Sequence, residues 1–287
     1  MVLSTQTSGG SKKIGDEKTV MLLAKAGFDA IDYSMFRMDD DDNILNTPEY
    51  ESYAGELRHI AKEHGVFFNQ AHAPFPSYRV GDEEYNKKIL PKIIRSMEVA
   101  SILGVKIIIV HPTDFGENNF ERNIEFYNSL APYCKQFNIK VALENMWGWD
   151  HKRDYIVSNV CSVPDEFAEF LDALDPAYFT GCLDLGHCGL VGVDAADAIR
   201  TLGGERIGAL HVHDNDYKAD THTLPFFADM NWGAITRALG EIEYKGDFTF
   251  EADAFIRNVP EELLFSAYKF MHDTGRYLIN KILQKII

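Results

Sequence analysis

Large hydrophobic residues alternate with small or polar residues in five short segments of the chain, and each segment reaches Glu, Asp or His near its end. In one of them, Val141 and Leu143 are large, whereas Ala142 and Glu144 between and after them are small or ionic. The same pattern occurs over residues 108–111, 181–185, 209–214 and 248–252. Alternation with a period of two predicts β-strands that pack one face on helices. Small residues on the other face are typical of strands that line the interior of a closed barrel.

Strand signals alternate with helix signals along the whole chain. The expected strands cover residues 1–7, 28–35, 66–72, 106–111, 140–144, 181–185, 207–213 and 247–253. The expected helices cover residues 16–26, 47–65, 84–103, 121–137, 164–174, 195–202, 232–242 and 261–283. This alternation predicts an α/β protein with the (β/α)8 TIM-barrel fold. A chain of 287 residues can form such a barrel as a single domain, which we expect over residues 1–287.

Three segments between these elements are expected to be irregular. Residues 8–13, which read Ser-Gly-Gly-Ser-Lys-Lys, predict a mobile loop. Residues 146–161 and 214–225 predict long loops that follow strands, on the face where TIM barrels carry out their chemistry. Within the helices, Pro91 predicts an interruption and Pro132 a kink.

The composition narrows the class of protein. The net charge of −16 disfavours a partner bound through phosphates, so no nucleic acid is expected. No apolar run approaches the length of a membrane span, so no membrane partner is expected either. The chain has four cysteines, none in a CxxC pair, and no signal peptide is recognisable at its start. Reduced thiols and a cytoplasmic location are therefore expected.

Polar residues at the ends of four successive strands form a candidate metal site. They are Glu144, Asp184, His211 and Glu251. Three carboxylates that surround one point near the barrel axis would repel one another unless a cation lay among them. Oxygen ligands with one nitrogen suit Mn²⁺, Mg²⁺, Co²⁺ or Zn²⁺. The alternative is pairing with Lys or Arg, which is disfavoured because no basic residue stands at the matching strand ends.

A second set of polar residues follows strands or lies in the expected loops. Its members are His72, His111, His187, Asp220 and His222. They could bind further metal ions or sugar hydroxyls, but a lone histidine is more often a hydrogen-bonded core residue, and both interpretations stay open. His213 is expected on the same strand face as His211 but further out, where it would contact substrate, support a ligand or face solvent. Trp147 would either cover a sugar face or pack within its loop.

Several motifs, in their order along the chain, resemble a known family. They are His72-Ala-Pro-Phe-Pro, Leu143-Glu144-Asn145, Leu183-Asp184-Leu-Gly-His187, His211-Val-His-Asp214, Asp220-Thr-His222-Thr-Leu-Pro and Phe250-Glu251. The set is similar to the xylose isomerase-like barrel superfamily, and within it to the sugar phosphate isomerase and epimerase branch, which includes the tagatose and psicose 3-epimerases. The resemblance implies a divalent-metal-dependent isomerase that acts on a small-molecule sugar or sugar phosphate. It is also compatible with a homo-oligomer.

The resemblance also implies roles for individual residues. A metal held by the four strand-end ligands would chelate a ketose carbonyl and its neighbouring hydroxyl, which acidifies the adjacent C–H bond. Of the catalytic pair, Glu144 and Glu251, one would remove that proton and the other would return a proton from the opposite face, through an enediolate. His187 would hold a substrate oxygen. Isomerisation between an aldose and a ketose needs the same metal and carbonyl, and stays open.

A phosphodiesterase is an alternative, because endonuclease IV belongs to the same superfamily. Its trinuclear zinc ligands are matched here by His72, His111, Glu144, Asp184, His187, His211, Asp220, His222 and Glu251. Against this interpretation, the loop after His72 is of the sugar type, His213 stands where the nuclease has Asn, and no basic stretch suits DNA. A dehydratase, a lyase or a sugar-binding relative is a further alternative on the same barrel.

The sequence departs from the ketose epimerases at one position expected to bind substrate. The chain lacks the Arg that follows the strand-seven motif of ketose epimerases, since residues 214–217 read Asp-Asn-Asp-Tyr. Selectivity for phosphate would be indicated by Lys or Arg at the rim of the barrel. Lys152 and Lys218, both in the expected long loops, are the candidates.

Overall fold

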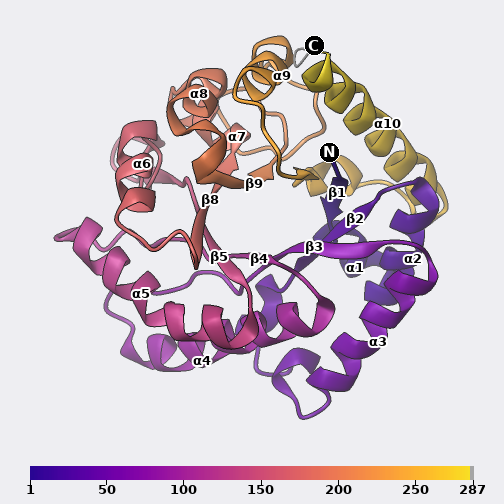
Figure 1. Ribbon diagram of the computed structural model, residues 1–287, viewed down its shortest axis with the longest axis horizontal. Coiled ribbons are helices and arrows are strands. Elements are labelled where there is room, and N and C mark those ends of the chain that lie inside the picture. Colours follow the sequence, from indigo (N-terminus) through magenta and orange to yellow (C-terminus); the bar gives the residue numbers. More distant parts are fainter. Residues whose placement is uncertain (285–287) are drawn as a thin grey trace.

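Eight parallel strands form a nearly closed barrel in the computed structural model, which describes residues 1–284 (Figure 1). The strands are β1 (Leu3–Gln6), β2 (Ala30–Ser34), β3 (Phe67–His72), β4 (Ile107–Ile109), β5 (Lys140–Glu144), β8 (Phe179–Asp184), β9 (Ile207–His211) and β10 (Phe248–Phe250). Their order in the sheet is β10-β1-β2-β3-β4-β5-β8-β9, and a parallel bridge from Val212 to Phe250 joins its two edges. The predicted TIM barrel is thus confirmed.

Helices surround the strands on all sides (Figure 1). They are α1 (Ser8–Ile14), α2 (Asp16–Ala26), α3 (Tyr50–Glu63), α4 (Glu83–Leu103), α5 (Asn119–Phe137), α6 (Pro164–Asp172), α7 (Leu185–Leu190), α8 (Ala195–Arg206), α9 (Trp232–Glu241) and α10 (Leu264–Leu283). Short 3₁₀ turns are η1 (Phe36–Asp39), η2 (Ile44–Asn46), η3 (Asp253–Ile256) and η4 (Glu261–Leu263). Among residues 1–284, none of the helices combines the length and hydrophobicity that a bilayer crossing requires.

The expected mobile loop at residues 8–13 is instead helix α1, so that prediction was wrong. Glycine disfavours helices, but Gly9 and Gly10 allow α1 to lie against its neighbours. A Cβ atom on Gly9 would lie 2.8 Å from Ile256, and one on Gly10 would lie 2.7 Å from the Tyr268 hydroxyl. Tertiary packing therefore decides the conformation here, and a local sequence pattern does not reveal it.

Other elements also differ from the expectation. The expected loop 146–161 contains an antiparallel hairpin of β6 (Trp147–Asp150) and β7 (Tyr155–Ser158). Pro91 and Pro132 lie inside the uninterrupted helices α4 and α5. Strand β8 passes directly into α7, which the sequence did not indicate. The helices expected from residues 47 and 261 begin later, at Tyr50 and Leu264, after short turns.

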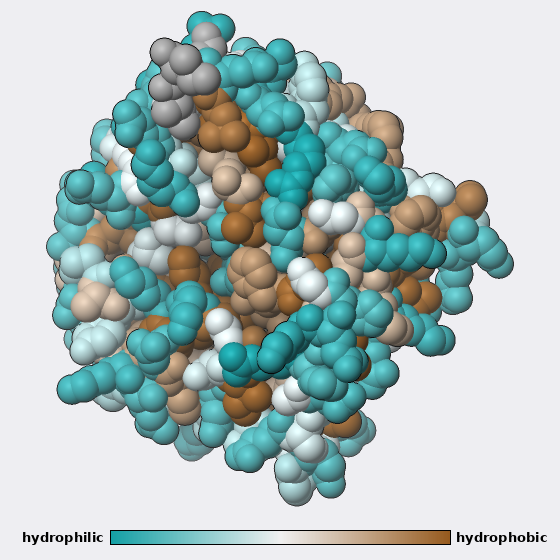
Figure 2. Space-filling model, turned by 45° about the vertical axis from the view of Figure 1, so that its right-hand side comes forward, coloured by the Kyte–Doolittle hydropathy of each residue, from teal (hydrophilic) through white to brown (hydrophobic). Residues whose placement is uncertain are grey.

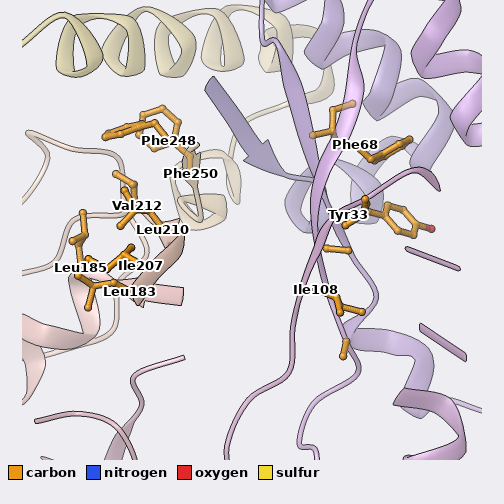
Figure 3. Packing of buried hydrophobic residues seen from close by; sticks show 14 of the residues in the cluster. Tyr33, Phe68, Ile108, Leu183, Leu185, Ile207, Leu210, Val212, Phe248 and Phe250 are labelled. Atoms are coloured by element: carbon orange, nitrogen blue, oxygen red, sulfur yellow. The ribbon is translucent and has the colours of Figure 1, made fainter. Parts of the chain in front are cut away.

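Side chains of the barrel strands divide between two buried clusters, as the alternation predicts. The smaller cluster lies inside the barrel and consists of Ile109, Ala142, Cys182 and Ala209. The larger cluster fills the space between strands and helices. From the patterned segments it includes Ile108, Leu183, Leu210, Val212, Phe248 and Phe250 (Figure 3). The small interior leaves the barrel axis open above it, where the polar strand ends meet.

The outer surface is mostly hydrophilic on the side that carries α2, α3 and α10 (Figure 2). Three large side chains of α10, Phe265, Phe270 and Tyr277, are nevertheless exposed. Lys25 lies over the ring of Phe265 at 4.8 Å, and Lys281 lies over that of Tyr277 at 5.4 Å. Two of the three exposed rings therefore take part in cation–π contacts. All four cysteines are buried and free.

The barrel interior can be tested by adding bulk to Ala142. We expect Ala142→Leu to lower the free energy of unfolding by about 1–3 kcal/mol, because the site is fully buried among packed neighbours. Ala173→Leu, the same change at an exposed residue after α6, should alter it by less than about 0.5 kcal/mol. Urea unfolding followed by circular dichroism measures both variants. Equal stabilities would contradict the placement of Ala142 inside the barrel.

Candidate active site

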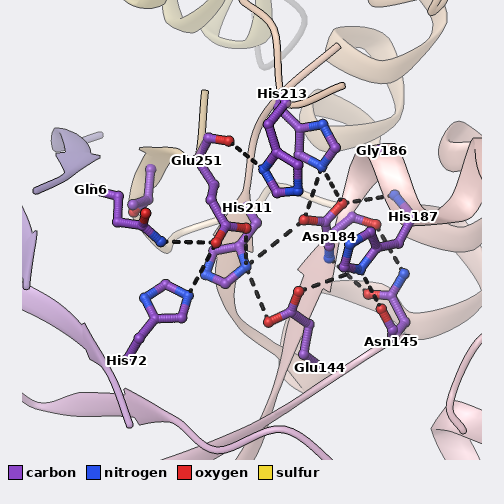
Figure 4. Close-up of polar contacts among 12 residues, drawn as sticks. Gln6, His72, Glu144, Asn145, Asp184, Gly186, His187, His211, His213 and Glu251 are labelled. Atoms are coloured by element: carbon purple, nitrogen blue, oxygen red, sulfur yellow. Dashed lines mark hydrogen bonds and ion pairs between the residues drawn. The ribbon is translucent and has the colours of Figure 1, made fainter. Parts of the chain in front are cut away.

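The four strand-end residues of the candidate metal site converge at the carboxyl end of the barrel (Figure 4). Glu144 ends β5, Asp184 ends β8 and His211 ends β9, while Glu251 directly follows β10. Each offers one oxygen or nitrogen atom, and these atoms all lie within 4.8 Å of one another. All four residues are buried. The structure therefore brings this predicted set together; below it is called the central cluster.

His211 lies in the middle of the central cluster. Its Nδ1 atom is 3.2 Å from Oε2 of Glu144, 3.1 Å from Oε2 of Glu251 and 3.9 Å from Oδ2 of Asp184. Burial lowers the pKa of His211, but the surrounding negative groups raise it well above its ordinary value. The position thus stabilises a positive charge.

The carboxylates of the central cluster are held in their ionised form by histidines. Burial raises the pKa of Glu144, but His211 and His111 lower it well below its ordinary value. For Asp184, burial again raises the pKa, and His187 and His213 lower it to about 2. Within residues 1–284, no Lys or Arg forms an ion pair with these carboxylates or with Glu251. The alternative in which Lys or Arg neutralises these carboxylates is therefore not found in the described residues.

The central cluster fits a divalent cation by its donor set and by its unfilled hydrogen bonds. Oε2 of Glu144 and both ring nitrogens of His211 are buried without a hydrogen-bond partner among the described residues. Buried polar atoms are otherwise almost always paired. Three carboxylates and one imidazole form a donor set that suits Mn²⁺, Mg²⁺, Co²⁺ or Zn²⁺.

A second ligand group lies beside the central cluster and consists of His187, His213, Asp220 and His222. One polar atom of each lies within 4.8 Å of the others. Nδ1 of His187 is 2.8 Å from the carbonyl of Asn145, and Nδ1 of His222 is 2.8 Å from the carbonyl of Glu251. A carbonyl only accepts hydrogen bonds, so both Nδ1 atoms carry the hydrogen, and the Nε2 atoms face Asp220.

His213 connects the two groups. It is fully buried, which excludes the solvent-exposed alternative, and its Nε2 atom lies 3.0 Å from Oδ1 of Asp184. Its ring stacks on that of His222 with centroids 4.0 Å apart. The ring also lies against Gly186, where a Cβ atom would be 2.0 Å from Cε1 of His213. Glycine is therefore the residue that lets His213 reach Asp184.

His72 and His111 support the two glutamates from the other side of the cluster. Nδ1 of His72 is 3.1 Å from Oδ1 of Asp32, and its Nε2 atom is 3.6 Å from Oε1 of Glu251. Nε2 of His111 is 3.1 Å from Oε2 of Glu144. His72 is fully buried and bonded to Asp32, as the interpretation of a hydrogen-bonded core residue expects, whereas His111 lies on the wall of the site cavity. A role of either histidine in binding metal or sugar stays a prediction.

Asp214 anchors the loop that carries Asp220 and His222. Its carboxylate accepts hydrogen bonds from the backbone of Phe226 and Met230 at 2.9 and 3.0 Å and from the Trp232 ring at 2.9 Å. The backbone of Asp214 also pairs with that of Thr223. The buried carboxylate of Asp214 therefore ties the loop 214–231 to the start of α9.

A cavity of about 560 Å³ opens above the central cluster. Its lining includes Gln6, Lys12, Phe36, Phe75, His111, Glu144, Trp147, His187, Asp220, His222, Glu251 and Asp253. Nε1 of Trp147 donates to Asp220 at 3.1 Å, so its ring is fixed at the wall. Lys152 and Lys218, the rim candidates from the sequence, are not among the lining residues.

A family model described as xylose isomerase-like TIM barrel matches residues 20–269 of the chain. The chain belongs to this family. The match spans strands β2 to β10 and therefore includes every residue of the central cluster and of the second ligand group.

Solved structures of this fold include several sugar epimerases. A D-tagatose 3-epimerase-like protein is 20% identical with a TM-score of 0.77, and the alignment covers 100% of both chains. A D-psicose 3-epimerase, solved in the presence of D-fructose, is 17% identical with a TM-score of 0.72 and covers 97% of this chain and 99% of its own. The 3-keto-D-glucoside 4-epimerase from E. coli is 16% identical with a TM-score of 0.70, with coverage of 96% and 99%. At these identities the likeness shows the fold.

The alignments with curated relatives cover less of the chain than those with the solved structures, and these relatives are named as uncharacterized proteins. An uncharacterized protein of Sinorhizobium fredii is 24% identical over 165 residues, which are 54% of this chain and 50% of that protein. The chain thus matches half the length of this relative. An uncharacterized protein of Mycobacterium leprae is 23% identical over 211 residues, 68% of this chain and 72% of its own.

The sequence patterns assigned no role to several residues that organise the site of this family member, although Asn145 stands in one of the motifs that carry the family resemblance. Gln6 at the end of β1 donates to Oε1 of Glu251 at 2.8 Å. The Asn145 side chain donates to the carbonyl of Asp184 at 2.9 Å and accepts from its backbone nitrogen at 2.7 Å. Asp32 in β2 holds His72. Gln6 and Asp32 could have been found from the sequence, because each is a polar residue near the end of an expected barrel strand.

The role of Gly186 gives a direct test of the link between the two ligand groups. We expect Gly186→Ala to lower the free energy of unfolding by about 1–3 kcal/mol, because the new methyl group overlaps the His213 ring. Gly55→Ala in α3 is the matched control, since its Cβ atom would meet no other atom within 4 Å. It should raise stability by about 0.5–1 kcal/mol. A Gly186→Ala protein as stable as wild type in urea unfolding would contradict the tight contact.

Proposed function

We propose that the protein is a divalent-metal-dependent sugar epimerase or isomerase that moves a proton on a carbon next to a substrate carbonyl. The observation that carries this proposal is the pair of buried glutamates in the central cluster. Glu144 and Glu251 come from strands separated in the barrel by β8 and β9, yet their carboxylates approach the same nitrogen of His211 at 3.2 and 3.1 Å. Two carboxylates on different sides of one point suit the removal and return of a proton.

The surroundings of the two glutamates keep them ionised, which is the form that can accept a proton. Each carboxylate has a lowered pKa, since neighbouring histidines outweigh the effect of burial. Gln6 donates to one oxygen of Glu251 and fixes the orientation of its carboxylate. Nε2 of His111 lies 3.1 Å from Oε2 of Glu144, where a protonated imidazole would stabilise the ionised carboxylate. One ionised glutamate would accept the proton from the substrate C–H bond. The other glutamate would first take up a proton from water and then deliver it to the opposite face of the substrate carbon.

The central cluster residues Glu144, Asp184, His211 and Glu251 would hold the cation. When bound, it supplies a Lewis acid that polarises the substrate carbonyl and acidifies the neighbouring C–H bond. Asn145 and His213 keep Asp184 in place through its backbone and its carboxylate.

The cavity suits a sugar. Phe36, Phe75 and Trp147 present aromatic surface on its wall, against which the C–H groups of a sugar can pack. Asp220, His187 and Gln6 present polar atoms that can bind hydroxyl groups. Several solved structures with this fold are epimerases of tagatose, psicose and related sugars by their titles, which supports the same substrate class here.

The proposal predicts that Glu251 is required for proton transfer. In D₂O, a panel of ketoses should take up deuterium next to the carbonyl when incubated with the metal-loaded protein. We expect Glu251→Gln to slow this uptake by about 10²–10⁴-fold, because an amide cannot accept the proton.

Glu169→Gln, an exposed position in α6, is the matched control and should leave deuterium uptake unchanged. Circular dichroism of both variants checks the fold. Near-normal uptake by a folded Glu251→Gln variant would contradict the proposed role of Glu251.

A metal-dependent phosphodiesterase is the second candidate function, and the second ligand group favours it. His187, His213, Asp220 and His222 provide three imidazoles and a carboxylate, a set that suits Zn²⁺. Several metal ions together are typical of enzymes that cleave phosphodiesters. The central cluster alone would serve the epimerase.

Metal stoichiometry separates the two candidates. For the epimerase or isomerase we expect about one divalent ion per chain by elemental mass spectrometry of protein purified without added metal. Asp184→Asn should lose that ion, because it removes a ligand of the central cluster, whereas Asp220→Asn should keep it. Roughly three zinc ions per chain, with loss of metal in Asp220→Asn, would favour the phosphodiesterase instead.

A further inference from the structure

Lys12 is the one Lys or Arg among the described residues that line the site cavity. It lies in the last turn of α1, directly after β1, whose Gln6 holds Glu251. The close packing of Gly9 and Gly10 against Ile256 and Tyr268 fixes the backbone of this helix. The Lys12 side chain therefore starts from a defined position on the wall of the cavity.

The Lys12 ammonium group has no fixed anionic partner. Among residues 1–284, no Asp or Glu forms an ion pair with it, although Asp16 and Asp253 lie on the walls around it. Asp16 accepts hydrogen bonds from the hydroxyls of Tyr33 and Tyr53 at 2.7 and 2.9 Å. Asp253 accepts from the Ser8 hydroxyl at 3.3 Å. Lys12 thus remains available to a ligand.

A smaller cavity of about 220 Å³ adjoins the first one, and both are lined by Ser8, Lys12 and Phe36. Its wall also carries Arg37 and Ser11, whose buried hydroxyl has no hydrogen-bond partner among the described residues. An ammonium, a guanidinium and serine hydroxyls are the groups that bind phosphate and carboxylate in proteins.

We infer that the substrate carries an anionic substituent, a phosphate monoester or a carboxylate, which Lys12 binds where the two cavities meet. This inference rests on the proposed function, because it places the sugar portion in the larger cavity above Glu144 and Glu251. A neutral sugar in the larger cavity would leave the buried Ser11 hydroxyl without a hydrogen-bond partner. The chain would therefore select acidic sugars over neutral ones through the last turn of α1.

Compounds without a ketone or aldehyde group cannot undergo the proposed reaction, so their binding tests the inference without any turnover. Isothermal titration of the metal-loaded protein would compare sorbitol, sorbitol 6-phosphate and gluconate. We expect at least one of the two anions to bind about tenfold tighter than sorbitol, the gain typical of a charge-assisted hydrogen bond. The better of the two anions identifies the substituent.

Lys12→Met keeps the length of the side chain and removes its charge, so it should abolish the preference for the anion and leave sorbitol binding unchanged. Lys218→Met, an exposed loop position, is the matched control and should preserve the preference. An anion that binds to the metal ion itself would keep its advantage in Lys12→Met, and that result would overturn the inference. Equal binding of all three compounds by wild type would overturn it as well.

The proposed proton-transfer reaction and the Lys12 subsite can be tested independently of each other. Anion preference through Lys12 with no deuterium uptake from any sugar would contradict the reaction and retain the subsite. Deuterium uptake from neutral ketoses, with no response of anion binding to Lys12→Met, would support the reaction and contradict the subsite.

Discussion

Three buried carboxylates around one imidazole set the electrostatic constraint on which the rest of this structure depends. Negative charges in a buried site are stable only when positive charge or hydrogen-bond donors compensate them. Here the compensation within the described residues comes from histidines: His111 and His211 face Glu144, and His213 faces Asp184. Gln6 adds a donor to the carboxylate of Glu251 at the edge of the cluster. A site compensated by imidazoles, which are also metal ligands, can exchange protons for a metal ion, whereas a site paired with arginine could not.

The barrel meets this constraint through the alternation of its strands. Small interior residues such as Ala142, Cys182 and Ala209 fill the axis below the cluster, so that the next inward position on each strand reaches a common point. Close contacts then refine the arrangement. Gly186 admits the His213 ring, and the Asn145 side chain bridges β5 to the end of β8. The proposed proton transfer depends on this geometry. The structural neighbours share the fold, with at most 20% of their residues identical in the alignments described.

Strand-level features could be predicted from the sequence because a period of two fixes which residues share a face. The TIM barrel, the central cluster and the ring of surrounding histidines all follow from that rule and from motif resemblance. Features decided by tertiary contacts could not be predicted in this way: the α1 helix at Gly9 and Gly10, the complete burial of His213, and the place of Lys12 on the cavity wall. The single domain over residues 1–287, the cytoplasmic location and a homo-oligomer stay predictions, because they depend on interactions beyond the contacts of residues 1–284.

The two ligand groups differ in how they are attached to the fold. The central cluster is built from barrel strand ends, whereas Asp220 and His222 stand on a loop that one carboxylate, Asp214, fastens to Trp232. A change in this loop can therefore alter the second ligand group while the residues of the central cluster stay in place at the strand ends. On such a scaffold, the number of metal ions and the chemistry they support become separable traits.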